Sequence, residues 1–107
     1  LYMSSRKVTY DKIIITKSDR DKKFKAHLTA EGGVSKTIHF GAKGMSDYTK
    51  NKDPKRKERY LARHNPKVTK EKWDVPDTAG SLSRWILWNK PSYNESLKDY
   101  KKRFKLK

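Results

Sequence analysis

The residues FKAHLTAE at positions 24–31 alternate between apolar and polar side chains. The apolar parity consists of Phe24, Ala26, Leu28 and Ala30. The polar parity consists of Lys25, His27, Thr29 and Glu31. Because successive side chains of a strand point to opposite faces, this pattern predicts a strand with one buried face and one face in water.

The segments on either side of this strand predict two more. Residues 7–16 are rich in side chains that favour β-structure, namely Val8, Tyr10, Ile13, Ile14 and Ile15. Residues 18–22 supply a polar turn, and Gly32 and Gly33 end the alternation on the other side. One side of residues 35–41 is then lined by Val34, Ile38 and Phe40. The first 41 residues therefore predict a three-stranded antiparallel meander.

Residues 53–104 predict about three short helices, of which the first starts at a clear capping signal. Asp53 can accept hydrogen bonds from free N–H groups, and Pro54 suits the first helical position. The helix should run to about Arg63. Its apolar face is narrow, so we expect it to lie on the surface with its basic side chains outward.

The second and third helices have stronger apolar patterns. Residues 79–89, after a Thr78 cap, are apolar around most of the helix, which predicts the most buried helix of the chain. Ser92 and Glu95 have the spacing of a capping box. One face of the helix that follows is lined by Tyr93, Leu97, Tyr100 and Phe104. Between the first two helices, residues 68–77 predict a loop held down by Trp73.

These elements predict a single α+β domain over residues 1–107. Its parts are the meander at 1–41, a helical part at 53–104 and a basic tail at 105–107. Within it, Trp85 and Trp88 suit either core packing or the stacking of nucleic-acid bases. We favour the core because only 33% of the residues are hydrophobic. Arg84 and Lys90 flank the two and are expected to pair with Asp77 or Asp99, whereas Tyr2, Tyr48 and Trp73 are expected nearer the surface.

The charge of the chain indicates an anionic partner. The net charge is +16 on 107 residues, about twice the upper end of what keeps a small domain soluble. Residues 50–72 carry ten basic and three acidic side chains, and residues 98–107 carry six and one. Clustering of this kind is typical of a protein that binds phosphates, acidic protein faces or anionic lipid. The candidate anion-binding residues are Lys36, Lys43, Lys55, Arg56, Arg59, Arg63, Lys98, Lys101, Lys102 and Arg103.

Sites for metals, cofactors or catalysis are not indicated by the sequence. There is no cysteine, and His27, His39 and His64 lack the spacing of metal ligands, which favours structural or surface roles. Gly41 and Gly44 fit turn glycines better than a phosphate-binding loop, although Lys36, His39 and Lys43 could contact a phosphate backbone there. Asp53 is expected to cap its helix, and Asp47 to fix the glycine loop or to pair with an arginine. We therefore expect a protein without enzymatic activity or cofactor.

Long stretches of the chain resemble a protein family. They are KTIHFGAKGMSDYT at 36–49, Asp53-Pro54 with Arg56, Arg59, Tyr60, Arg63 and His64, TAG at 78–80, SRWILWNKP at 83–91, and Arg103-Phe104. Over about Lys36 to Phe104 the chain resembles small basic proteins encoded by large nucleocytoplasmic DNA viruses. The resemblance implies a eukaryotic host and a non-enzymatic role in the virion or on viral DNA.

Two functions fit these observations. In the first, which we favour, the chain is a structural protein of the virion, a minor capsid or internal component whose basic side chains bind acidic surfaces of coat proteins, anionic lipid or packaged genome. In the second, it binds and condenses viral DNA without reading its sequence. Either function predicts a location in the capsid shell or interior, and in the host cytoplasm or nucleus during assembly. The longest apolar runs, at 13–15 and 85–88, are far too short to cross a bilayer, so no transmembrane segment is expected.

Overall fold

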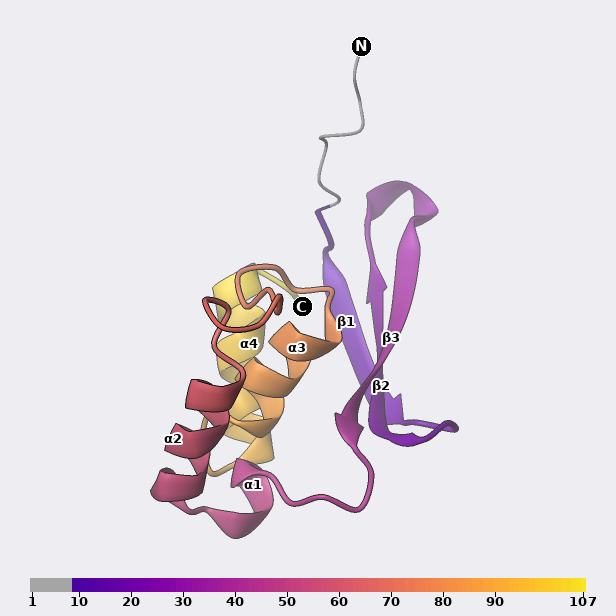
Figure 1. The fold of residues 1–107 in the computed structure, drawn as a ribbon. Helices are drawn as coiled ribbons and strands as arrows, with labels where there is room; N and C mark the ends of the chain where they lie inside the picture. The colour runs from indigo at the N-terminus through magenta and orange to yellow at the C-terminus, as the bar shows by residue number, and fades with distance from the viewer. Residues whose placement is uncertain (1–8) are drawn as a thin grey trace.

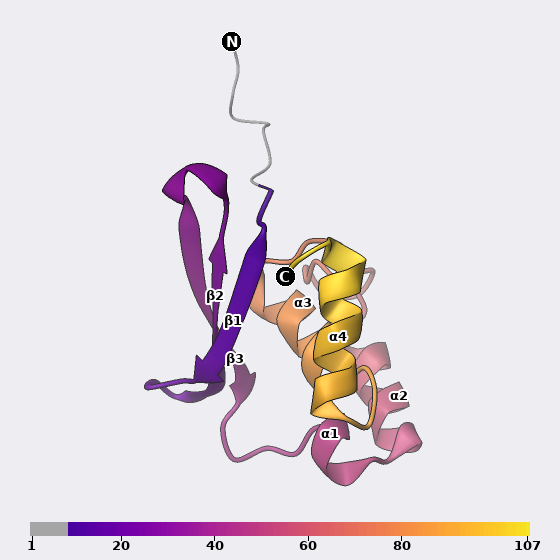
Figure 2. The same ribbon diagram turned by 180° about the vertical axis from the view of Figure 1, so that it is seen from behind.

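The fold is an α+β arrangement in which a sheet is followed by helices, as the sequence predicts. The structure, a computed structural model, describes residues 9–107. Strands β1 (Lys12–Lys17), β2 (Lys22–Thr29) and β3 (Ser35–Ala42) form an antiparallel sheet in the order β1-β2-β3. In two opposite views all the labelled helices lie on one side of this sheet (Figures 1 and 2).

The register of the sheet places the predicted apolar parity against the helices. Ile13 pairs with Leu28, and Ala26 pairs with Ile38. The side chains of Ile13, Ala26 and Leu28 are buried, whereas His27 on the opposite parity is exposed. The alternation at residues 24–31 therefore identified the buried face correctly.

Two details of the predicted meander differ from the structure. β1 begins at Lys12, so residues 9–11 of the predicted first strand are not part of it. Residues 7 and 8 of that prediction lie outside the described part, as does Tyr2. Val34 was expected to face inward with Ile38 but is 49% exposed. It follows the 3-10 turn η1 (Glu31–Gly33) and precedes β3, so the ladder does not orient its side chain.

The helical part contains the expected helices and one more. Helix α2 (Pro54–Arg63) and helix α4 (Tyr93–Phe104) match the predicted bounds closely. The predicted helix 79–89 consists of α3 (Ala79–Leu82) continued by a π-helix, η2 (Ser83–Leu87). The short helix α1 (Tyr48–Asn51) was not predicted. Within residues 9–107 no helix combines the length and the apolar character that spanning a bilayer requires.

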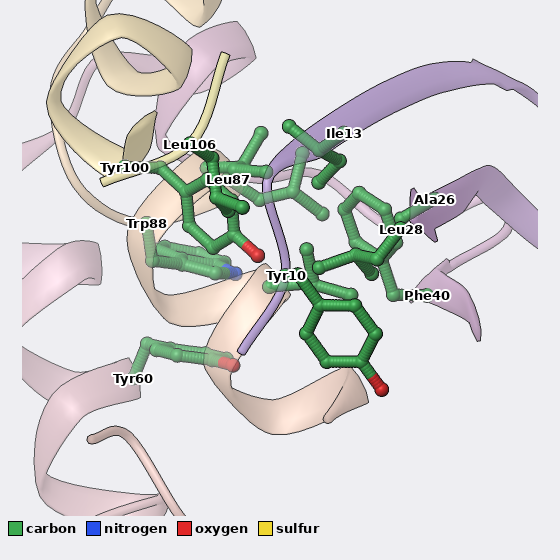
Figure 3. Packing of buried hydrophobic residues seen from close by; sticks show 12 residues of the cluster. Tyr10, Ile13, Ala26, Leu28, Phe40, Tyr60, Leu87, Trp88, Tyr100 and Leu106 are labelled. Carbon is green, nitrogen blue, oxygen red and sulfur yellow. The ribbon is translucent and has the colours of Figure 1, made fainter. Parts of the chain in front are cut away.

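The α3–η2 segment is the centre of the core, as its apolar pattern predicts. Leu82, Ile86 and Leu87 are buried, and Trp88 is 9% exposed. Figure 3 shows Leu87 and Trp88 among buried side chains from the sheet and from α4. Trp85 is only half-buried, and its Nε1 donates to the carbonyl oxygen of Trp73 at 2.7 Å. That bond attaches the irregular segment 68–77 to the core through the Trp73 backbone, whereas the Trp73 indole Nε1 donates to Glu71 Oε1 at 3.1 Å within the same loop.

The C-terminal residues, which were predicted as a basic tail, pack onto the sheet. Leu106 is 7% exposed and belongs to the core cluster. The backbone of Lys107 accepts a hydrogen bond from Ile13 at 3.0 Å and donates one to Asp11 at 2.9 Å. These bonds lie on the edge of β1 that does not pair with β2. The end of the chain therefore supplies hydrogen-bond partners for some of the backbone groups on that edge.

Candidate anion-binding cleft

Helix α2 carries the site, and its start is fixed by the predicted cap. The Asp53 carboxylate accepts hydrogen bonds from the backbone N–H groups of Lys55 at 3.0 Å and Arg56 at 3.4 Å. Pro54 occupies the first helical position, where no N–H partner is needed. Together they fix where the helix begins and which of its side chains turn outward.

The inner face of α2 rests on an aromatic stack. The ring of Tyr60 lies 4.4 Å from that of Trp88 with only 6° between the planes, and His64 stacks on Tyr60 at 4.2 Å. Figure 3 shows Tyr60 and Trp88 lying nearly parallel. Burial raises the pKa of the Tyr60 phenol well above its ordinary value, with Glu71 adding to the effect, so this hydroxyl stays neutral in the stack.

Lys57 also belongs to the inner face. Its ammonium donates to the carbonyl oxygen of Asn89 at 2.6 Å and lies over the ring of Tyr48 at 5.1 Å from the centroid. Burial, and then the positive charges of Arg84 and Lys90, lower the pKa of Lys57. The Lys57 ammonium is therefore bound within the fold and is not available to a partner.

Three arginines of α2 converge on one cleft. Arg56, Arg59 and Arg63 are spaced i, i+3 and i+7, which puts them on one side of the helix, and all three are exposed. They line a cleft of about 250 Å³. The rest of its lining is Met45, Ser46 and Trp88. The lining contains no carboxylate, and within residues 9–107 none of these arginines forms an ion pair.

A second, larger cleft of about 400 Å³ adjoins the first and shares with it Met45, Ser46, Arg63 and Trp88. It extends between β3 and α3, towards Gly41 and Gly80. Except for the exposed Lys22, the charged groups at this end are already engaged. Lys23 pairs with Asp47 at 2.5 Å, and His64 Nδ1 lies 2.5 Å from Glu71 Oε2. The unneutralised positive charge is therefore concentrated at the arginine end.

The connection between β3 and α1 forms the other wall of the cleft, and Asp47 holds it in place. This residue is 2% exposed and pairs with Lys23, so it does not take the arginine partner that we considered. Its carboxylate also accepts from the backbone N–H of Thr49 at 2.9 Å and from the Thr49 hydroxyl, which caps α1. The cap and the ion pair position Met45 and Ser46 opposite α2.

The candidate residues of α4 form a separate surface. Lys98 and Lys102 are exposed and Lys101 is half-buried. Helix α2 is nearer the viewer in Figure 1 and α4 is nearer in Figure 2, so the two basic helices lie on opposite sides of the buried α3–η2 segment. The excess positive charge is therefore divided between two surfaces, one on each helix. The sequence gives no indication of this separation.

Arg103 on α4 takes part in an internal cluster. It pairs with Asp99 at 3.3 Å, and its guanidinium lies 3.6 Å from the ring centroid of Trp85. Partial burial of Asp99 opposes ionisation, but hydrogen bonds from Asn89 and Arg103 outweigh it and hold the pKa of the Asp99 carboxyl below its ordinary value. Arg103 is thus less available to a partner than the lysines beside it.

The pairing expected for Arg84 and Lys90 is wrong. Within the described residues, neither forms an ion pair with Asp77 or Asp99. Arg84 instead donates from Nη1 to the carbonyl oxygen of Trp88 at 2.9 Å and lies over the ring of Trp85 at 4.1 Å. Burial, together with Arg103, lowers the pKa of Arg84. The guanidinium of Arg84 stacks on an aromatic ring, so the ring takes the place of the carboxylate that we expected as its partner.

The remaining candidates are not brought together. Lys36 pairs with Asp77 at 3.5 Å, and Lys43 follows β3 about 20 Å further along the extended chain. His39 bonds the hydroxyl of Ser18 at 2.7 Å, and His27 bonds that of Thr37 at 3.0 Å. Within residues 9–107 no three His, Asp or Glu side chains are grouped as metal ligands would be. Gly41 and Gly44 have φ values of +86° and +83°, as turn glycines do.

Sequence reasoning found the arginines of the cleft but missed Met45, Ser46 and Trp88 as their neighbours. The i, i+3, i+7 spacing of the arginines could have indicated a common face. The other wall depends on how the connection between β3 and α1 folds back on α2, which is a long-range contact that no local pattern encodes.

Comparison with protein families gives a match over the first half of the chain. Residues 13–64 are similar to a family of unknown function, DUF5754. The matched segment runs from β1 through α2 and so contains Arg56, Arg59 and Arg63. No curated protein and no solved structure matches the chain.

Proposed function

We propose that this chain is a non-enzymatic structural protein of a virion that docks on an acidic neighbour through helix α2. The observation that carries the proposal is the cleft lined by Arg56, Arg59 and Arg63 without any carboxylate. Guanidinium groups that no internal acid neutralises are stabilised when an anionic surface covers them. The viral setting rests on the resemblance of residues Lys36 to Phe104 to proteins of large DNA viruses.

The charge distribution supports docking over a merely solvated surface. Among residues 9–107, the lysines and arginines that form ion pairs are Lys23, Lys36 and Arg103. The chain has 28 basic residues, so the internal acids neutralise few of them. A partner is thus expected to cover much of this charge, and in a minor capsid or internal component the partner would be a coat protein or another virion protein.

The proposal is tested on gradient-purified particles treated with nuclease and washed in high salt. Mass spectrometry then measures the ratio of this chain to the coat protein. A fixed ratio that survives the treatment is expected for a structural component. Loss of the chain together with the DNA would contradict the proposal and favour a DNA-condensing protein, which uses the same cations.

A further inference from the structure

The arginine cleft is more specific than a general basic surface. Three arginines line about 250 Å³ of space, and no acidic side chain lines it. Surface cations that only keep a protein soluble are spread apart and interspersed with acids. A cleft lined by Arg56, Arg59 and Arg63 without an acid indicates an anionic ligand.

The ligand chemistry follows from charge and size. A carboxylate carries one negative charge, whereas a phosphate monoester carries about 1.5 to 2 and offers three acceptor oxygens. Arginine presents a planar fork of donors that fits such oxygens two at a time. The cleft is smaller than the roughly 300–1,000 Å³ of sites that hold a whole small molecule, so a single compact group fits it best.

The neighbouring cleft indicates what the group is attached to. This space of about 400 Å³ shares part of its lining with the arginine cleft and is also lined by Phe40, Leu87 and the exposed Met45. Gly41 and Gly80 add no side chain to its walls. A strip of chain on either side of the charged group would lie here. The phosphates of a nucleic acid carry one charge each, whereas a phosphate monoester concentrates up to about two charges on one group.

We propose that the cleft binds a phosphorylated serine or threonine side chain of the acidic neighbour, with the adjoining cleft holding the residues beside it. This inference rests on the proposed docking function. Ser46 adds a donor, because its oxygen already accepts a hydrogen bond from Asn51 Nδ2 at 3.2 Å and its own O–H can point to a phosphate oxygen. Arg63 lines both clefts and joins the two parts of the site.

The test is calorimetric titration of the full chain with four probes: a Gly/Ser peptide bearing one phosphoserine, the same peptide unmodified, the same peptide with glutamate in that position, and a duplex DNA of arbitrary sequence. The phosphopeptide should bind at least about tenfold more tightly than the unmodified and glutamate peptides. Arg59→Gln should weaken phosphopeptide binding by about tenfold or more. Lys102→Gln on α4 removes the same charge outside the cleft and should change it less than about twofold.

The outcomes separate this inference from the proposed function. If the glutamate peptide binds as tightly as the phosphopeptide and both depend on Arg59, acidic docking stands and the phosphate assignment is overturned. If duplex DNA binds more tightly than the phosphopeptide and loses affinity in Arg59→Gln, a nucleic acid is the partner and both proposals fail. Equal weakening by Arg59→Gln and Lys102→Gln would show a nonspecific charge effect and overturn the site. Thermal unfolding of each variant verifies that the fold is retained.

Discussion

At the scale of single residues, the Asp47–Lys23 pair is the polar contact on which the cleft wall depends. The Asp47 side chain is 3% exposed and that of Lys23 is 10% exposed. Asp47→Asn keeps an oxygen that can cap α1 but leaves the Lys23 ammonium buried without its counter-charge. We expect the free energy of unfolding to fall by roughly 3 kcal/mol, measured by urea denaturation.

The matched control for this variant is Asp53→Asn. Asp53 caps α2 but forms no ion pair in the described part of the chain, and asparagine is an equally good cap. Its unfolding free energy should change by less than about 0.5 kcal/mol. Similar losses in the two variants would contradict the importance assigned to the buried pair.

Gly41 is a residue at which β3 lies close to η2 and β2. A Cβ atom there would lie 3.0 Å from Leu87 Cδ1 and 3.1 Å from Lys23 Cβ, and φ is +86°. Gly41→Ala should therefore lower the unfolding free energy by roughly 2 kcal/mol through backbone strain and crowding. Gly44→Ala has nearly the same φ with open space around its Cβ, so it should cost only the strain, about 1 kcal/mol. Equal melting temperatures for the two variants would show that the close contact carries no energy.

At the scale of elements, helix α4 is stabilised by the contacts of Asp99. The folded pKa of this carboxyl is below its ordinary value of 3.8, so the native state holds its proton less tightly than the unfolded chain does. The stabilisation is therefore fully present above that ordinary value and is lost as pH falls through the lower folded pKa. Asp99→Asn should cost about 1 kcal/mol at neutral pH, and the cost should shrink on acidification to about pH 3.

Asp74→Asn is the reference for this pH series, because Asp74 is exposed and forms no ion pair within residues 9–107. Its urea midpoint should follow that of the unmodified chain at every pH. A cost of Asp99→Asn that is constant across the range would contradict the role given to the charged carboxylate.

The elements also differ in how far local sequence specifies them. Strand β2 and helices α2 and α4 were predicted because alternation, the Asp53 cap and the Ser92 cap are local signals, and the Ser92 hydroxyl does accept from the Glu95 N–H. Helix α1 was missed because four residues give no periodicity, and its cap depends on Asp47, which a distant lysine holds in place.

The site was predictable only in part for the same reason. The sequence indicated the outward arginines of α2 and left out Lys57, which the fold uses, but it could not indicate that Met45 and Ser46 form the opposite wall of the cleft. Nor could it indicate that Leu106 folds back into the core. In each case the outcome depends on contacts between residues far apart in the chain.

At the scale of the whole molecule, the net charge of +16 opposes compaction. Salt screens repulsion between exposed charges, with a Debye length that falls from roughly 14 Å at about 50 mM to roughly 4 Å at about 500 mM. The urea midpoint of unfolding should therefore rise over this range of sodium chloride. A midpoint that is unchanged or falls would mean that repulsion does not limit the stability of this fold.

The central claim is that α2, and not the excess charge in general, engages the partner. The most direct measurement is the dissociation constant for purified coat protein of two variants that each lose three positive charges, Arg56→Gln/Arg59→Gln/Arg63→Gln on α2 and Lys98→Gln/Lys101→Gln/Lys102→Gln on α4. The account predicts at least about tenfold weaker binding for the α2 variant and less than about threefold for the α4 variant. Equal losses in the two variants, or no measurable binding by the unmodified chain, would contradict it.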